Sequence, residues 1–306
     1  MLQRFDPRNR DLLVNINGRL VHRNQASVSP FDSSVQGGDA VWEGLRLYEG
    51  KVFRLSAHLA RLRDSAHALG FAEIPDEDHI VSELRRTLEA NFMWDGVHVR
   101  LTLSRGVKLT SGMDPRLNQS GPTLIVLAEH KRPVYQKTGL SLITSSIRRP
   151  PPDCLDPKIH HNNLLPSILA KIEANAAGAD DALMLDTHGF VAETNATNLF
   201  LVKSGIVFTP FCKACPEGIT RDTVLRLCRA EGIETREADL SVMEFYRADE
   251  VFCTGTMGEL APIARIDGRA IASGQPGPMS ARLSELFTQE VLKTGEVILE
   301  APPEPA

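Results

Sequence analysis

The chain has 306 residues, a length typical of two domains at roughly 100–200 residues each. Apolar residues make up 42% and charged residues 24%, and 39 acids against 34 bases give a net charge of −5 with His neutral. This composition argues against disordered, collagen-like and membrane classes. No cluster of Lys and Arg favours nucleic acid, no apolar run approaches the roughly 18 residues that cross a bilayer, and the polar first residues show no secretion signal. We therefore expect neither a nucleic-acid nor a membrane partner.

Five cysteines are an odd number in a long chain, which favours a reducing compartment, the cytoplasm, over a disulfide framework. Cys212 and Cys215 have the spacing of a redox pair or of half a zinc site, but no second pair exists. We interpret them as loop thiols that can oxidise, with a redox switch as the alternative. His160 and His161 are adjacent and point to opposite sides of an extended strand, so we expect no metal site.

Two tight hairpins are predicted near the start of the chain, with turns at Asn17-Gly18 and Glu49-Gly50. Alternation along the strand before the second turn puts Glu43 on the apolar face. Helical spacing then predicts a helix at residues 55–69 and another that Asp76 caps, and alternation predicts strands at residues 97–103 and 123–128.

Four prolines and two arginines interrupt the pattern at residues 148–157. We therefore take residues 146–158 as a linker between an N-terminal α/β domain, residues 1–145, and a C-terminal one, residues 159–306. In the second domain we expect helices at residues 164–177, 219–231, 241–245 and 278–292, with short strands at 182–185, 198–202 and 206–209 and near 251 and 262. The predicted fold class is mixed α/β (α+β) with two domains, since strands outnumber the helices between them.

Two glycine-containing turns are candidate anion sites. Residues 218–222 precede a helix whose first N–H groups lack partners, and residues 254–258 follow a strand. An ordinary helix cap and an ordinary turn are the alternatives. Glu193 is either a buried hydrogen-bonded acid or an exposed edge carboxylate, and Lys158, in an acid-poor segment, is either an amine of low pKa or a solvated one. Motifs of nicotinamide enzymes, nucleotide hydrolases and serine hydrolases are absent.

These segments together carry a family resemblance. Residues 158–162, 193–198, 218–222 and 255–259 resemble, in order, the class IV pyridoxal-phosphate-dependent aminotransferases. That family includes branched-chain and D-amino-acid aminotransferases and aminodeoxychorismate lyases. The resemblance extends upstream through residues 42–46 and 58–62 and so covers nearly the whole chain. It implies the family's two-domain fold, pyridoxal 5′-phosphate as cofactor, most of the cofactor site in the C-terminal domain, and a homodimer.

The resemblance also implies a role for individual residues. Lys158 would form the Schiff base and carry the proton, and Glu193 would keep the pyridine nitrogen protonated. The residues implied to hold the rest of the cofactor are Arg61, Ile219, Thr220 and Thr256 at the phosphate and Asn163 at the ring oxygen. Those implied to contact substrate are Trp42, His98, Arg100, Thr256 and Met257.

The pocket departs from the branched-chain pattern, because Asn163, Gly37 and His98 replace tyrosines and Met257 replaces Ala or Thr. We predict a pyridoxal-phosphate-dependent aminotransferase acting on small amino and keto acids, with branched-chain amino acids and 2-oxoglutarate as the first substrates to consider. A D-amino-acid or primary-amine aminotransferase, an aminodeoxychorismate-type lyase and a non-catalytic metabolite-binding protein are the alternatives.

Overall fold

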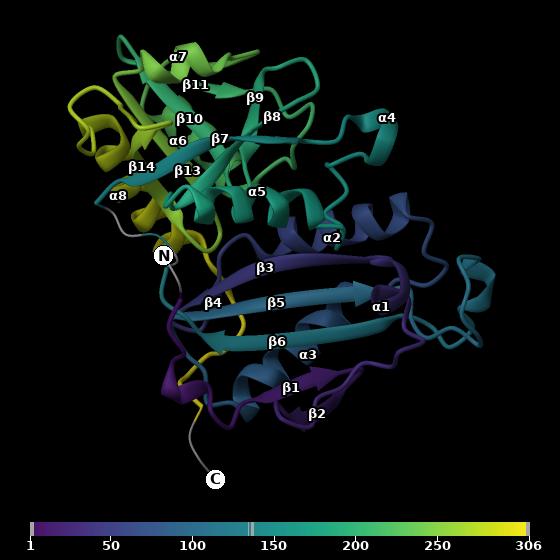
Figure 1. Ribbon diagram of the computed structural model, residues 1–306. Helices are drawn as coiled ribbons and strands as arrows, with labels where there is room; N and C mark the ends of the chain where they lie inside the picture. The colour runs from purple at the N-terminus through teal and green to yellow at the C-terminus, as the bar shows by residue number, and fades with distance from the viewer. Residues whose placement is uncertain (1–2, 134, 136–137, 304–306) are drawn as a thin grey trace. The chain divides into compact units, whose positions relative to one another are not determined.

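The computed structural model describes residues 3–133, 135 and 138–303, and these residues form two units, each built around one sheet (Figure 1). The N-terminal unit contains the described chain before Pro133, the segment Ile159–Asn163 and the described chain from Val291. The C-terminal unit contains the described residues of Pro133–Lys158 and Leu164–Glu290. The predicted mixed α/β class with two sheet-based parts is confirmed.

The N-terminal unit has an antiparallel sheet, which in the described residues has seven strands in the order β16-β4-β3-β5-β6-β1-β2. The strands are β1 (Leu13–Ile16), β2 (Arg19–His22), β3 (Ala40–Tyr48), β4 (Lys51–Val52), β5 (Val97–Ser104), β6 (Thr123–His130) and β16 (Glu296–Val297). Helices α2 (Leu55–Ala68) and α3 (Glu77–Ala90) cover one face, and the aliphatic core lies between them and the sheet (Figure 1). A short helix, α1 (Ser33–Gly37), precedes β3, and 3₁₀ turns lie at Pro7–Asn9 and Pro115–Leu117.

Both predicted hairpin turns and the predicted helix cap form. Asn17 and Gly18 have φ angles of 49° and 76°, as the tight turn between β1 and β2 requires. Gly50 has φ of 76°, and an added Cβ would lie 2.4 Å from the Trp94 ring, so this turn needs glycine for two reasons. Asp76 accepts the His79 N–H at 2.7 Å and caps α3.

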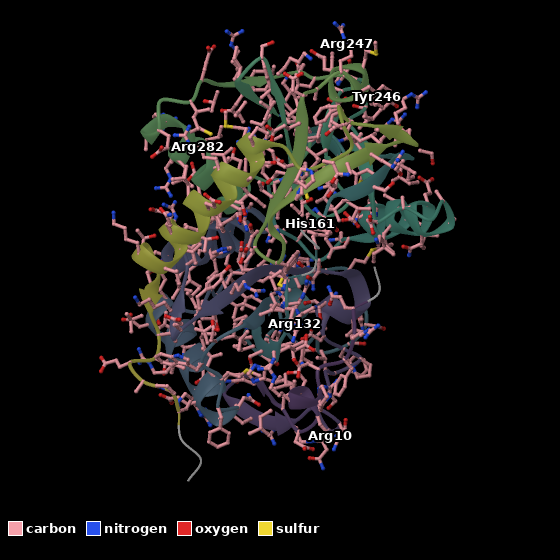
Figure 2. All side chains as sticks on the ribbon, turned by 90° about the vertical axis from the view of Figure 1, so that its left-hand side faces the viewer. Arg10, Arg132, His161, Tyr246, Arg247 and Arg282 are labelled. Carbon is pink, nitrogen blue, oxygen red and sulfur yellow. The ribbon has the colours of Figure 1, made fainter. Side chains whose placement is uncertain are left out.

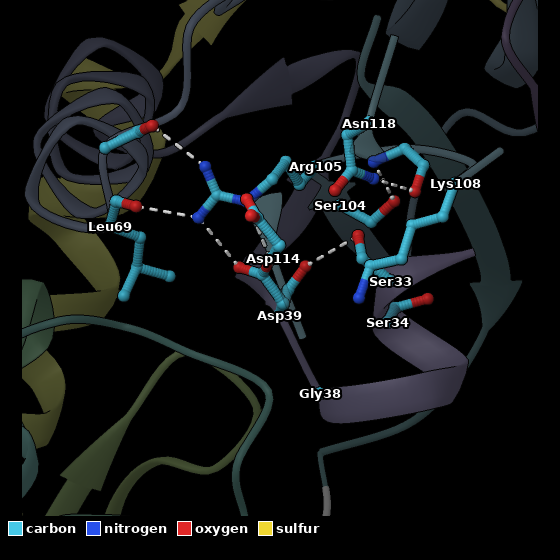
Figure 3. A network of polar contacts seen from close by, with 12 residues as sticks. Ser33, Ser34, Gly38, Asp39, Leu69, Ser104, Arg105, Lys108, Asp114 and Asn118 are labelled. Carbon is cyan, nitrogen blue, oxygen red and sulfur yellow. Dashed lines mark hydrogen bonds and ion pairs between the residues drawn. The ribbon is translucent and has the colours of Figure 1, made fainter. Parts of the chain in front are cut away.

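A polar network fixes the turn between α1 and β3 (Figure 3). Arg105 donates to both carboxylate oxygens of Asp39, at 2.7 and 3.1 Å, and to the carbonyl oxygens of Leu69 and Gly70. The Ser33 hydroxyl donates to the carbonyl oxygen of Asp39 at 3.4 Å. The end of α2 and the start of β3 are therefore held by one guanidinium group.

The C-terminal unit has a mixed sheet of nine strands within the described residues, in the order β12-β11-β10-β13-β14-β7-β8-β9, with β15 paired to β14. The strands are β7 (Leu140–Arg148), β8 (Asp181–Leu185), β9 (Val191–Thr194), β10 (Asn198–Lys203), β11 (Ile206–Pro210), β12 (Thr235–Ala238), β13 (Glu250–Gly255), β14 (Glu259–Ile266) and β15 (Arg269–Ala270). The helices are α4 (Pro152–Leu155), α5 (Leu165–Ala176), α6 (Ile219–Ala230), α7 (Val242–Tyr246) and α8 (Pro278–Thr294), which continues past Glu290. α5 packs on β7 and β8, and α6 packs on β13.

Helix α8 is fixed by charged side chains from other elements. The carboxylate of Glu250 accepts the N–H groups of Met279 and Ser280, both at 2.8 Å, and so caps the helix. Arg282 lies on α8 (Figure 2). Its guanidinium donates to Glu231, directly after α6, at 2.7 Å. Within the described ranges, no helix combines the length and apolarity needed to cross a membrane.

The observed units differ from the predicted boundaries at 145 and 158. β7 pairs in parallel with β8 and β14, so the predicted linker begins inside the second sheet. Residues 159–163 belong to the N-terminal unit because they pair with the edge of β3. The backbone N–H of Trp42 donates to the His160 carbonyl oxygen, and that of Asn162 donates to the Ala40 carbonyl oxygen. The last strand, β16, pairs with β4. Pairing between segments far apart in the chain leaves no local sequence signal, which explains the difference.

Candidate functional site

The C-terminal unit contains a buried ion pair between Glu193 and Arg149. Glu193 lies in β9 and Arg149 directly follows β7, and Arg149 Nη2 is 2.7 Å from Glu193 Oε1. The same guanidinium donates from Nε to the carbonyl oxygen of Ala214 at 3.2 Å and from Nη1 to Ser167 Oγ at 3.1 Å. Three contacts in different directions hold the planar group in one orientation. Glu193 is thus a buried, ion-paired acid and not an exposed edge carboxylate, and its role toward a cofactor stays a prediction.

Burial dominates the ionisation of Glu193. It raises the pKa of this carboxyl to about 7, and the positive charge of Arg149 opposes the rise. A carboxyl with this pKa changes its charge near neutral pH, so a second positive group placed beside it would favour the ionised form.

The two predicted anion turns lie next to each other, because both pack against the start of β10. A Cβ on Gly218 would lie 1.9 Å from Asn198 Oδ1, and a Cβ on Gly255 would lie 3.0 Å from Thr197 Cγ2. Asn198 also pairs with Thr254 in the sheet. Glycine at both turns lets the backbone approach β10 closely, which is the kind of cradle that presents N–H groups to an anion.

Polar groups in this cradle fit a phosphate. Gly218 is the N-cap of α6, and within the described part of the chain this helix has no side-chain cap hydrogen bond, so Thr220 is not the capping hydroxyl of the alternative interpretation. The first N–H groups of a helix without such a cap are suited to bind an anion. Thr254 Oγ1 is buried and has no hydrogen-bond partner among the described residues, and Thr256 and Met257 are half-buried just beyond it.

Lys158 lies beyond α4 in the C-terminal unit. Its side chain is exposed, and its backbone N–H donates to Asp156 Oδ1 at 3.0 Å. In the described part of the chain, its ammonium group has neither a hydrogen bond nor an ion pair. The amine is thus accessible to an aldehyde, and its catalytic role stays a prediction.

The N-terminal unit contains a second buried carboxylate, Glu43, whose side chain has no exposed surface. Arg61 donates to its two oxygens at 2.8 and 2.7 Å, His58 Nδ1 lies 2.6 Å from Oε2, and His160 Nδ1 lies 3.3 Å from Oε1. Burial would raise the pKa of Glu43, but His160 and Arg61 outweigh it and hold the pKa well below its usual range. Arg61 therefore binds an internal carboxylate, and its predicted phosphate contact is untested.

The opposite face of the same sheet is positively charged. Arg100 stacks over the Trp42 ring at 4.0 Å and donates to Asn162 Oδ1 at 2.9 Å. Burial and the charges of Lys131, Arg100 and Arg46 lower the pKa of His98 to about 3, so this imidazole is neutral at pH 7. The predicted shared face of His98 and Arg100 follows from the pairing of β3 with β5.

Asn163 and Gly38 contact each other in the N-terminal unit, where Asn163 Nδ2 donates to the Gly38 carbonyl at 3.2 Å.

Arg149 was not predicted as a site residue, because it lies in the proline-rich stretch taken as a linker. Its signal in the sequence is a pair of adjacent arginines at the end of residues 140–152, a stretch without Asp or Glu.

Comparison with known proteins identifies the family. The model of "Amino-transferase class IV" matches residues 40–266. The chain belongs to the class IV aminotransferases. A branched-chain-amino-acid aminotransferase-like protein of Arabidopsis thaliana is 54% identical over 92% of this chain, and a putative branched-chain-amino-acid aminotransferase of Methanocaldococcus jannaschii is 41% identical over 92% of this chain and 97% of its own length.

Solved structures support the same assignment. A T.th. branched-chain amino acid aminotransferase, complexed with N-(5′-phosphopyridoxyl)-L-glutamate, superimposes with a TM-score of 0.87 and 31% identity over 94% of this chain and 99% of that one. The predicted class IV fold is thereby confirmed. Pyridoxal 5′-phosphate, the cofactor of this family, is confirmed with it. The chain spans about half the length of two Arabidopsis relatives, 50% and 51%.

The raised pKa of Glu193 predicts a pH-dependent stability of the cofactor-free protein. The folded pKa of about 7 lies above the ordinary value of 4.5. The contribution of Glu193 to the free energy of unfolding is therefore complete below pH 4.5 and is lost as the pH rises through 7. Between pH 5 and pH 8, the free energy of unfolding of the wild type should fall by about 2–3 kcal/mol more than that of Glu193→Gln. Urea titrations at both pH values measure this difference.

The matched control is Glu234→Gln, an exposed acid of the same unit. It should keep the wild-type pH dependence. An equal pH dependence of Glu193→Gln and wild type would contradict the raised pKa.

Proposed function

We propose that this protein is an aminotransferase and that its C-terminal unit holds pyridoxal 5′-phosphate. The observation that carries the proposal is the buried Arg149–Glu193 pair in the same unit as the two adjacent glycine turns. A cofactor with a basic ring nitrogen and a phosphate needs an acid for the first and N–H donors for the second. This unit offers both kinds of group, which supports the fit.

The bound cofactor supplies an aldehyde that bonds amines and a ring that accepts the electrons of the substrate Cα–H bond. Glu193 holds a proton at the ring nitrogen, and Arg149 holds the Glu193 carboxylate in its orientation. The N–H groups of Ile219 and Thr220 bind the phosphate, together with Thr256. Lys158 Nζ would carry the proton between the substrate Cα and the carbon that bears the cofactor's aldehyde group, in one direction in the first half of the reaction and in the other in the second.

The reaction has two halves. An amino donor transfers its amino group and leaves as a keto acid, and a second keto acid then accepts the same group. We infer a branched-chain amino acid as the amino donor, which the names of the relatives support, and 2-oxoglutarate as the acceptor.

The positively charged face in the N-terminal unit supports carboxylate substrates. Arg100 is partly buried, and no carboxylate pairs with it among the described residues. Burial lowers its pKa, which is the expected direction for a cation without a partner charge. Arg46 and Lys131 add positive charge near His98. An anionic substrate would compensate these charges.

Covalent trapping tests the role of Lys158. Borohydride reduction of the cofactor-loaded protein followed by peptide mapping should find the cofactor on Lys158. Lys158→Ala should abolish turnover and labelling, since both the covalent bond and the proton carrier are lost. Glu193→Gln should keep the label on Lys158 but lose at least a hundredfold in kcat, because an amide cannot hold the ring proton.

Lys203→Ala is the control, since Lys203 forms an exposed ion pair with Asp249 and should stay fully active. A label on any other lysine would reassign the catalytic residue. Bound cofactor with no covalent label would show that Lys158 does not bond to the cofactor and that its amine stays in solvent.

Kinetics of Arg100→Ala test the substrate class. A charge-assisted hydrogen bond is worth about 1.5–3 kcal/mol, so KM for glutamate and 2-oxoglutarate should rise about 10–100-fold. If KM for a monocarboxylic substrate rises equally, Arg100 binds the α-carboxylate. If that KM rises less than KM for glutamate, Arg100 binds the distal carboxylate. The exposed Arg116→Ala is the control. Unchanged KM values for both substrates would assign Arg100 a structural role only.

We further propose a homodimer. Along α5, Leu165, Ile168, Leu169 and Ile172 recur at helical spacing and are each about half or more exposed, at 69%, 51%, 47% and 56%. A second copy of the chain would cover this stripe. Sedimentation velocity should show a dimer that Ile168→Glu shifts toward monomer by at least tenfold in Kd, and a monomeric wild type at micromolar concentration would contradict the proposal.

A cytoplasmic location also belongs to this proposal. In the described residues the cysteines are free thiols, and three of them are buried. Free thiols are typical of reducing compartments, which supports the cytoplasm. Cell fractionation checks it, and a signal in a secreted fraction would contradict it.

A further inference from the structure

The loop between β11 and α6 contains two thiols that the proposed reaction does not use. Cys212 is half-buried and Cys215 is buried. A hydrogen bond from the Cys215 thiol to the Cys212 sulfur lowers the pKa of Cys212 and raises that of Cys215. Arg221 further favours the Cys212 thiolate, and Glu217 and Glu193 oppose it. One sulfur is therefore accessible and reactive, and the second lies in hydrogen-bond contact behind it.

The same loop supports both parts of the proposed cofactor site. The carbonyl oxygen of Ala214, between the two cysteines, accepts the Nε–H of Arg149, whose Nη2 pairs with Glu193. Asn198 Nδ2 contacts Cys215 Sγ at 3.8 Å and donates to the Pro216 carbonyl at 3.2 Å. The other atom of that amide, Asn198 Oδ1, fills the space where a Cβ of Gly218 would lie.

We propose that Cys212 and Cys215 form a dithiol–disulfide site that small-molecule disulfides oxidise, and that closing this disulfide weakens binding of pyridoxal 5′-phosphate. The first part rests on the spacing, exposure and mutual contact of the two thiols, and the second part rests on the proposed function.

The reaction balances as thiol–disulfide exchange. The Cys212 thiolate attacks one sulfur of the small disulfide and releases one small thiolate. Cys215 gives its proton to water and attacks the Cys212 sulfur of the mixed disulfide, which releases the second small thiolate. In sum, one protein dithiol is oxidised, one small disulfide is reduced to two thiols, and no other oxidant is needed.

Closing the bond must change the loop. Two sulfurs in hydrogen-bond contact approach to about 2.05 Å in a disulfide, and the backbone between them has to follow because only two residues separate them. Ala214, one of those two, then shifts relative to Arg149, and Cys215 Sγ shifts relative to Asn198. Both shifts act on groups next to the proposed ring-nitrogen and phosphate positions.

A metal site is the competing interpretation of this spacing. In the part of the chain that the structure describes, no group of three or more His, Cys, Asp and Glu side chains is placed to hold a metal ion. The pair therefore lacks the further ligands that a zinc site requires.

The test uses the cofactor-loaded full chain in glutathione buffers of increasing oxidised fraction. Alkylation and peptide mass spectrometry should show a Cys212–Cys215 bond that dithiothreitol reverses. Equilibrium dialysis should give a Kd for pyridoxal 5′-phosphate about tenfold higher in the oxidised form, the size of one lost hydrogen bond to a charged group. Cys212→Ser and Cys215→Ser should bind the cofactor equally in both buffers.

Cys154→Ser is the matched control: it removes an exposed thiol that glutathione can modify, and it should keep the rise in Kd on oxidation. Free Cys212 and Cys215 in a buffer that modifies Cys154 would overturn the proposal, as would a formed disulfide with the Kd unchanged within twofold. If the chain binds no cofactor in either buffer, the proposed function fails, while peptide mapping still decides whether the disulfide forms.

Discussion

The buried contact between Arg149 and Glu193 is the interaction on which the C-terminal site depends. A carboxylate at this depth is costly unless a cation and hydrogen bonds accompany it, and removal of either partner would leave a buried charge. Arg149 reaches Glu193 because β7 and β9 flank β8 in the sheet. The pair therefore joins β9 to the end of β7 across the intervening β8, and a protonatable group can persist there with a pKa near neutrality.

Steric constraint shapes the anion cradle in the same unit. Gly218 and Gly255 both approach β10 so closely that a Cβ on either would meet Asn198 or Thr197. Backbone N–H groups are thus presented without an intervening side chain, and a helix dipole adds to their positive potential. Asn198 is shared between the cradle and the loop of Cys215, so a covalent change in that loop has a direct structural route to the cradle.

The two faces of the sheet in the N-terminal unit differ in how the charges on them are compensated. Alternation along β3 directs Glu43 toward α2, where Arg61 compensates its charge and His58 contacts it inside the core. The same alternation on β5 directs His98 and Arg100 to the other face, where positive charge is not balanced by a bonded carboxylate among the described residues. Internal compensation on one face and excess charge on the other follow from strand geometry.

The sequence alone determined the hairpins at Asn17-Gly18 and Glu49-Gly50, the cap at Asp76, most helices, and the family through its ordered motifs, since each depends on residues close in the chain. It also indicated Glu193 and the two glycine turns as candidate parts of the site. Only the tertiary structure decided that β7 belongs to the second sheet, that residues 159–163 extend the first, and that Arg149 holds Glu193. These features depend on pairing and burial between distant segments, for which a single sequence carries no periodic signal.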